Sequence, residues 1–137
     1  MNDNSTKKVL IFGVFDMLHP GHVYFINESM KYGESLHVCL ATDEYVLKYK
    51  NKKTKNDYKN RELELKKVFP NIKIIQGDDD IGDWSVFKNI NPDVFVFGYD
   101  QKELAKAIGD LGFGEDVETF YVDGWKPELY NTTNLSV

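Results

Sequence analysis

Two histidines separated by two residues, His19 and His22, are the side chains of this sequence best suited to chemistry. Residues three apart lie on one face of a helix, so both imidazoles could donate hydrogen bonds to a single phosphate group. Such donors stabilise the negative charge that develops on a phosphate during a displacement reaction. The pair could also be half of a metal site, but only His37 remains as a further histidine, and it lies in an expected strand. The pattern therefore predicts phosphate chemistry and no metal held by protein ligands.

The residues around this pair predict a strand that leads into a helix. Residues 9–12 form a short apolar run that is typical of a buried strand, and the apolar residues at 23, 26 and 30 follow a helical period. The first turn of a helix has unpaired N–H groups and a partial positive charge, and it binds anions readily. Pro20 is tolerated in that turn, and Gly21 allows a close approach of the backbone to a ligand.

A basic segment lies further along the chain. Residues 48–61 hold seven Lys/Arg and one Asp (net +6), whereas the remaining residues hold 10 Lys/Arg and 21 Asp/Glu (net −11). Two interpretations stay open for residues 48–60: a solvated surface loop, or a mobile basic loop whose lysines close on phosphates. Among its lysines Lys50 is the predicted phosphate contact, and Arg61 follows the loop at the start of an expected helix.

Length and composition limit the class of protein. The 137 residues form one expected domain, 1–137, with a loose tail at 1–6. No leader-like or membrane-spanning apolar run is visible, and a lone Cys39 in an apolar run indicates a buried thiol in a reducing cytoplasm. The net charge of −5 argues against a nucleic-acid binder.

The order of expected elements predicts an α/β fold. We expect a single Rossmann-like domain with a mainly parallel five-stranded sheet flanked by helices, because strands and helices alternate. The expected strands are residues 7–15, 35–41, 72–75, 94–97 and 117–122, and the expected helices are 20–32, 61–69, 84–89 and 101–111. The acidic turn at 77–83 lacks the spacing of a calcium loop and is interpreted as a solvated loop that caps the helix at 84–89. Ligands of such sheets bind at the carboxyl ends of the strands, which here carry 13–16, 42–44, 98–100 and the segment before Thr132.

The motif from Gly13 to His22, GVFDMLHPGH, resembles the signature of the cytidylyltransferase-like nucleotidyltransferases, also called the HxGH superfamily. Residues 92–101, PDVFVFGYDQ, resemble a segment of the branch that includes archaeal-type FAD synthetases. Residues 126–133 are similar to the end of that branch and occupy the place of the Ile-Ser-Thr-Thr motif of glycerol-3-phosphate cytidylyltransferases. The Arg-Thr-x-Gly lead-in and the Gly-Asp-Asp-Trp turn of the glycerol-phosphate enzymes are absent.

The resemblance implies transfer of a nucleotidyl group from a nucleoside triphosphate, ATP or CTP, to a small phosphorylated acceptor such as FMN or glycerol 3-phosphate, with release of pyrophosphate. It implies Mg²⁺ carried mainly by the nucleotide phosphates and a possible homodimer. It assigns catalysis to His19, His22, Lys50 and Arg61. It assigns nucleotide binding to Gly13, Val14, Phe15, Asp16, Gly21, Gly98, Asp100, Asn131, Thr132 and Thr133.

Several alternatives remain open at this point. Asp16 could only brace its turn, Asp100 could be a helix N-cap, and Thr132 and Thr133 could cap a last helix. A non-catalytic nucleotide-binding module that keeps the fold is the alternative function. A dinucleotide-binding redox domain is excluded, because no G-x-G-x-x-G pattern follows the first strand.

Overall fold

The computed structural model describes residues 7–112 and 116–124. It contains a five-stranded sheet with the strand order β3-β2-β1-β4-β5, in which every pair is parallel. The strands are β1 (Lys8–Gly13), β2 (Ser35–Leu40), β3 (Lys73–Gln76), β4 (Val94–Gly98) and β5 (Glu118–Val122). The predicted α/β fold with a parallel five-stranded sheet is confirmed.

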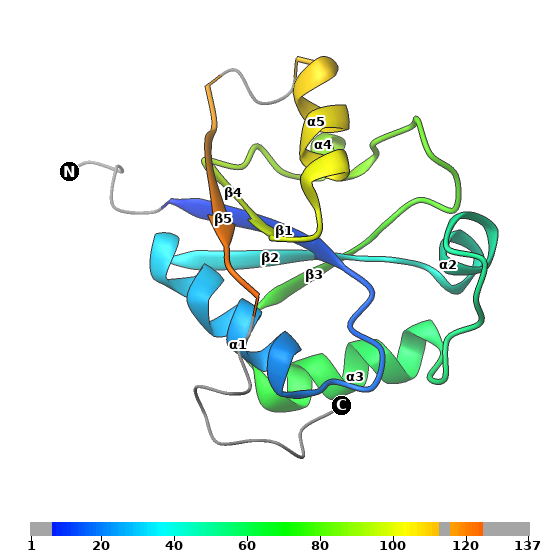
Figure 1. Ribbon diagram of the computed structural model, residues 1–137. Helices are drawn as coiled ribbons and strands as arrows, with labels where there is room; N and C mark the ends of the chain where they lie inside the picture. The colour runs from blue at the N-terminus through cyan, green and yellow to red at the C-terminus, as the bar shows by residue number, and fades with distance from the viewer. Residues whose placement is uncertain (1–6, 113–115, 125–137) are drawn as a thin grey trace.

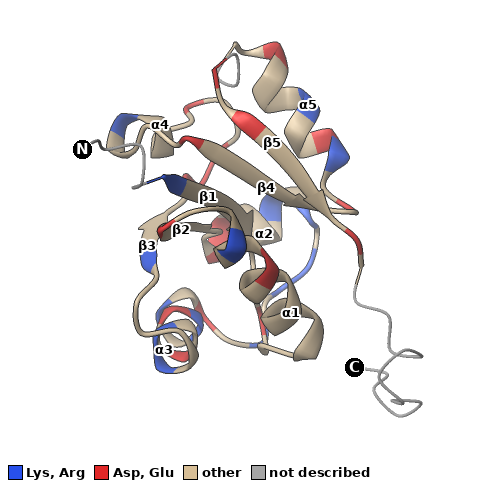
Figure 2. Ribbon diagram, turned by 90° about the vertical axis from the view of Figure 1, so that its left-hand side faces the viewer, with Lys and Arg blue, Asp and Glu red and all other residues tan. Residues whose placement is uncertain are grey.

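Helices cover both faces of the sheet (Figure 1). Helices α1 (Pro20–Ser29) and α3 (Tyr58–Val68) pack on one face, and α4 (Val86–Asn89) and α5 (Lys102–Asp110) pack on the other. Helix α2 (Asp43–Tyr49) lies beyond the carboxyl end of β2, and a short 3-10 turn, η2 (Met30–Tyr32), follows α1. Acidic and basic residues are interspersed along α3 and α5 (Figure 2), and most of them are exposed, as expected of helices with one face in water.

The alternation of side chains along the strands builds two separate cores. In β1, Val9 and Ile11 pack toward α1 and α3, whereas Leu10 and Phe12 pack toward α4 and α5. All four are less than 9% exposed, because a central parallel strand is buried on both faces. This pattern makes β1 a rigid support for whatever follows its carboxyl end.

The order of the strands locates a ligand site. β1 pairs with β2 on one side and with β4 on the other. The chain continues from β1 through β2 to β3 on one side and then crosses to β4 on the other, so the strand order reverses at this point of the sheet. Loops diverge at such a switch point, and the crevice between them is where ligands bind in open α/β sheets. The loop that leads to His19 and to the first turn of α1, which contains His22, begins here, directly after Gly13. It is called the histidine loop below.

Several predicted element bounds need correction. Helix α2 was not predicted, although Thr42 caps it by accepting a hydrogen bond from the Tyr45 N–H at 3.1 Å. The helix expected at 61–69 begins at Tyr58, because Asp57 caps it. The loop predicted at 48–60 therefore spans only residues 50–57. The helix expected at 84–89 begins at Val86 and its N-cap, Ser85, makes no side-chain capping bond.

Candidate functional site

The two histidines form the N-terminal cap of α1. His19 is the N-cap residue, and its Nδ1 accepts a hydrogen bond from the Gly21 N–H at 3.1 Å. Three residues on, the Nδ1 of His22 accepts from the His19 N–H at 3.4 Å. The two rings stack with their centroids 3.7 Å apart and their planes 20° apart. Each histidine thus satisfies one backbone donor of the helix start and holds the other ring in place.

These hydrogen bonds define which nitrogen carries the proton in the neutral form of each ring. A neutral imidazole has one nitrogen that accepts and one that carries the proton, and Nδ1 accepts in both residues. The proton of each neutral ring therefore lies on Nε2. The structure therefore places two stacked imidazoles, each with an Nε2–H donor in its neutral form, at the N-terminus of α1, where the helix itself attracts anions.

The pKa of His22 favours this neutral form. Burial, which has the largest effect, acts with the neighbouring His19 and the Lys52 ammonium to lower this pKa from 6.5 to about 4, and Asp16 acts in the opposite direction. At neutral pH, without a ligand, His22 is a hydrogen-bond donor rather than a cation.

The loop between β1 and α1 is held in an uncommon conformation. Phe15 and Met17 have φ values of +49° and +51°, a region that non-glycine residues rarely adopt. The buried Phe15 ring meets the His22 ring edge-on at 5.4 Å and supports it from below. A Cβ at Gly13 would lie 2.5 Å from the Phe15 ring, so only glycine fits there. Strain of this kind is typical of functional loops.

Arg61 was predicted to contact phosphate, and the structure places it differently. Its guanidinium is buried, with a side-chain exposure of 0%. Its Nη1 donates to the carbonyls of Val14 at 2.9 Å and Ala41 at 2.8 Å, and its Nε donates to the Asn56 carbonyl at 3.1 Å. Its Nη2 donates to Asp43 Oδ1 at 2.7 Å. With four of its five N–H groups used inside the protein, Arg61 is a positioning residue that joins the ends of β1 and β2 to the α2–α3 loop.

Two carboxylates anchor the basic loop to the same place. Asp16 accepts from the backbone N–H groups of Lys55 at 2.7 Å and Asn56 at 3.0 Å. Asp43 accepts from the Tyr58 N–H at 3.0 Å and from the Thr54 hydroxyl at 3.2 Å. Asp16 was predicted to bind nucleotide, with a brace of its own turn as the alternative; in the structure its two oxygens accept from the backbone of the basic loop instead.

The lysines of this loop differ in their surroundings. Lys48 belongs to α2 and is ion-paired with Asp80 in the loop before α4. Lys50, the predicted contact, is the exposed C-cap residue of α2. Lys52 is exposed, and its charge affects the pKa of His22. Lys50 stays the predicted phosphate contact, and Lys52 is the lysine of this loop whose charge lowers the pKa of His22.

The end of β4 lies across the crevice from the histidine loop. Gly98 is its last residue, and a Cβ there would lie 3.0 Å from Asp100 Oδ1. Asp100 is exposed and is not the N-cap of α5, a position that Gln101 occupies. Gly21 lies in the first turn of α1, as expected. The predicted residues Asn131, Thr132 and Thr133 lie outside the described residues.

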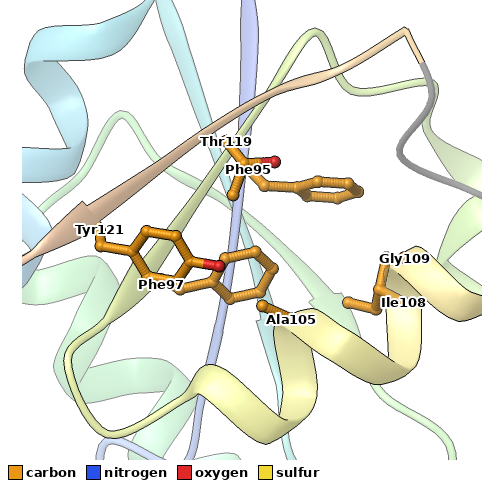
Figure 3. Close-up of a pocket in the computed structure, with 7 residues that line it drawn as sticks. All are labelled: Phe95, Phe97, Ala105, Ile108, Gly109, Thr119 and Tyr121. Atoms are coloured by element: carbon orange, nitrogen blue, oxygen red, sulfur yellow. The ribbon is translucent and has the colours of Figure 1, made fainter.

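Two hollows lie near these elements, and neither contains a histidine. One, of about 330 Å³, lies between α5 and the strands β4 and β5, with an aromatic floor (Figure 3). The other, of about 430 Å³, lies between the β1–α1 loop and α3. Its lining residues are Phe15, Met17, Leu18, Asn56, Asn60, Arg61 and Glu64.

Two searches of the described residues bear on metals and membranes. Within residues 7–112 and 116–124, no three side chains of the His, Cys, Asp or Glu type come together as a possible metal site. In the same ranges, none of the helices combines the length and the apolar character that crossing a bilayer requires.

Comparison with known proteins agrees with this geometry. A family model described as cytidylyltransferase-like matches residues 10–121, which include the histidine loop and all five strand regions. The chain belongs to the cytidylyltransferase-like family. It is 34% identical over 114 residues to a protein named FAD synthase from Picrophilus torridus, covering 80% of this chain and 81% of that protein. It is also 36% identical over 126 residues to a protein named FAD synthase from Methanobrevibacter smithii, covering 82% of this chain and 77% of the relative.

A solved structure has the same architecture. The lipopolysaccharide core biosynthesis protein from Thermoplasma volcanium superposes with a TM-score of 0.73 at 30% identity, covering 88% of this chain and 98% of that one. The predicted family is thereby confirmed, and with it the prediction that this member of the cytidylyltransferase-like family is a nucleotidyltransferase enzyme. These relatives favour the enzyme over a non-catalytic binding module.

Three residues near the site were not among the predicted site residues. Asp43 anchors Arg61 and the basic loop, Lys52 is the lysine that affects His22, and Gln101 joins two strands as described below. For Asp43 a signal was present, because a Thr followed by two acidic residues is typical of a helix start. For Lys52 and Gln101 no local pattern exists, since both roles depend on residues distant in the sequence.

Proposed function

We propose that this nucleotidyltransferase transfers AMP from ATP to FMN, which forms FAD and releases pyrophosphate. The relatives named FAD synthase, aligned over about four fifths of the chain, support ATP and FMN as the substrates. The PDVFVFGYDQ segment supports the same branch, and it forms β4 and the start of the following loop.

The observation that carries the proposal is the stacked pair of histidines at the N-terminus of α1, in which each Nδ1 accepts a backbone hydrogen bond and leaves Nε2 to donate. In the proposed reaction a phosphate oxygen of FMN attacks the α-phosphorus of ATP. The new P–O bond forms in line with the breaking bond between the α-phosphorus and the oxygen that bridges to the β-phosphate, and pyrophosphate leaves with that electron pair. A phosphate is already a nucleophile, so positioning and charge stabilisation suffice. His19 and His22 donate to the oxygens on which negative charge accumulates.

The other predicted contacts complete the proposal. The backbone of Val14 and Phe15 follows β1 and reaches the phosphates, while Gly98 and Asp100 contact the nucleoside across the crevice. Asn131, Thr132 and Thr133 retain their predicted role toward the phosphates. Lys52, or Lys50 as first predicted, supplies the mobile positive charge that offsets the repulsion between the two anionic substrates.

The carboxylate of the histidine loop, Asp16, is already engaged with backbone N–H groups, so a divalent cation would be held mainly by the nucleotide phosphates. Both oxygens of Asp16 accept backbone hydrogen bonds, and no other cluster of metal-ligating side chains occurs among residues 7–112 and 116–124. We propose that Mg²⁺ enters with the triphosphate and neutralises part of its charge. We further propose a homodimer in the cytoplasm that does not bind nucleic acid, in keeping with the family resemblance and the net charge of −5.

The test is pyrophosphate release in the presence of Mg²⁺, with ATP and CTP each combined with FMN and with glycerol 3-phosphate. Release with ATP and FMN only is the expected result. Release with CTP and glycerol 3-phosphate would overturn the choice of substrates but keep the reaction type. Binding of a nucleotide without release for any pair would restore the non-catalytic module.

A further inference from the structure

Gln101 occupies an unusual place at the switch point of the sheet. It is the N-cap residue of α5, a position that favours Ser, Thr, Asp and Asn, because their short side chains bond to the helix start. The Gln101 side chain makes no such bond. It turns instead toward the sheet, where its Nε2 donates to the Phe12 carbonyl at 2.9 Å and its Oε1 accepts from the Gly98 N–H at 2.9 Å.

The pairing of the strands explains what this side chain does. β1 pairs with β2 over six residues, Lys8–Gly13, but with β4 over only two, Val9 with Val94 and Leu10 with Phe95. Carried forward with the same offset, the parallel ladder would place Phe12 opposite Phe97 and would direct the Gly98 N–H to the Phe12 carbonyl. These two groups are the ones that Gln101 joins. Its amide is inserted into the ladder where the next direct hydrogen bond would form.

The two strand ends are therefore separated by the width of one amide group, at the crevice that lies between the histidine loop and Gly98–Asp100. We propose that Gln101 is a positioning residue that sets the width of this crevice and thereby the distance between the α1 phosphate site and the nucleoside contacts on β4. The inference rests on the proposed function only in taking a nucleotide as the ligand. A misplacement of reacting groups by about 1 Å can cost on the order of 10²-fold in rate, so a fixed spacing matters.

The experiment uses three variants of Gln101. Gln101→Met keeps the length and removes both hydrogen bonds. Gln101→Asn keeps an amide and is a better N-cap, but it is too short to reach both strands. Gln101→Glu keeps the length and the acceptor for Gly98, yet as a carboxylate it faces the Phe12 carbonyl with an oxygen. Gln76→Met makes the same substitution as a control at an exposed residue on β3, which is not adjacent to the gap.

The measurements are the Kd of ATP without acceptor, the melting temperature, and kcat for pyrophosphate release. For Gln101→Asn we expect ATP binding weakened roughly tenfold, the size of a lost buried hydrogen bond, although α5 has a better cap. Gln101→Met should show the same loss, while Gln76→Met should bind as the wild type does. For Gln101→Glu, the ATP affinity is compared with that of the wild type at the same pH. The loss of affinity should become smaller as the pH falls, because a protonated carboxyl both donates and accepts as the amide does.

Two results would overturn the inference. Wild-type ATP affinity in Gln101→Asn would show that the bridge between the two strands does not affect the nucleotide site. A purely structural role would give a different result. All three variants would then lose ATP affinity equally at every pH, and the loss would follow the fall in melting temperature. If the wild type binds ATP but releases no pyrophosphate with FMN, the proposed acceptor fails while the ATP affinities of the variants still decide the role of Gln101.

Discussion

Replacement of the single arginine of the chain, Arg61→Lys, should destabilise the fold far more than it weakens substrate binding. The buried guanidinium donates four hydrogen bonds, three to carbonyls and one to Asp43. A lysine ammonium on a shorter reach can replace one or two of these and cannot imitate the fork. Each lost bond from a charged donor to a buried acceptor is worth about 1.5–3 kcal/mol. Water can reach the partly exposed Asp43, so its share is smaller.

The expected loss is therefore roughly 3 kcal/mol of unfolding free energy, within the range for breaking a buried charged group's contacts. For a domain of this size that corresponds to a fall in melting temperature of roughly 10 °C. Chemical denaturation and a thermal melt measure it, with Lys59→Ala on the exposed face of α3 as the control. The KM for ATP, measured well below the melting temperature, should change less than threefold.

The opposite pattern would refute this reasoning. If Arg61→Lys melts like the wild type but raises the KM for ATP tenfold or more, the guanidinium must leave its buried position and contact phosphate during turnover. The pH dependence gives a second check. Burial alone would raise the pKa of Asp43, but hydrogen bonds from Arg61, the Tyr58 N–H and Thr54 outweigh it and lower the pKa. Asp43 thus stabilises the fold above its unfolded pKa of about 4, and the deficit of Arg61→Lys should shrink as pH falls below that value.

Three further predictions concern the histidines and the basic loop. His22→Asn retains an acceptor for the His19 N–H but loses the Nε2–H donor, so kcat should fall by roughly 10²-fold or more. His37→Asn is the control. An unchanged kcat in His22→Asn would remove His22 from the mechanism. The pKa of His22 falls from 6.5 to about 4 on folding, so the unfolded chain binds more protons between these pH values. The free energy of unfolding should therefore rise with pH from about 4 to 6.5, by at most about 3 kcal/mol. Urea denaturation at several pH values measures this rise, which should be smaller in His22→Asn. Lys52→Ala should raise the KM for ATP more than Lys50→Ala does, and equal or reversed effects in steady-state kinetics would return the phosphate contact to Lys50.

The sequence by itself determined the architecture and the location of the site. Continuous apolar runs of four to six residues predict strands buried on both faces, and their alternation with helical patterns leaves a parallel sheet as the expected result. The histidine pair after the first strand could be placed at a helix N-terminus for the same local reason. These features depend on neighbouring residues, which is why spacing along the chain reveals them.

Only the tertiary structure shows which groups Arg61, Asp16 and Gln101 contact. The Arg61 hydrogen bonds reach partners 47, 20 and 18 residues away, and Gln101 reaches Phe12 across 89 residues. A charged or amide side chain looks the same in a sequence whether it faces a ligand or satisfies buried carbonyls. Which of these holds depends on the backbone groups that folding leaves without partners, and those are defined only when strands distant in the sequence come together.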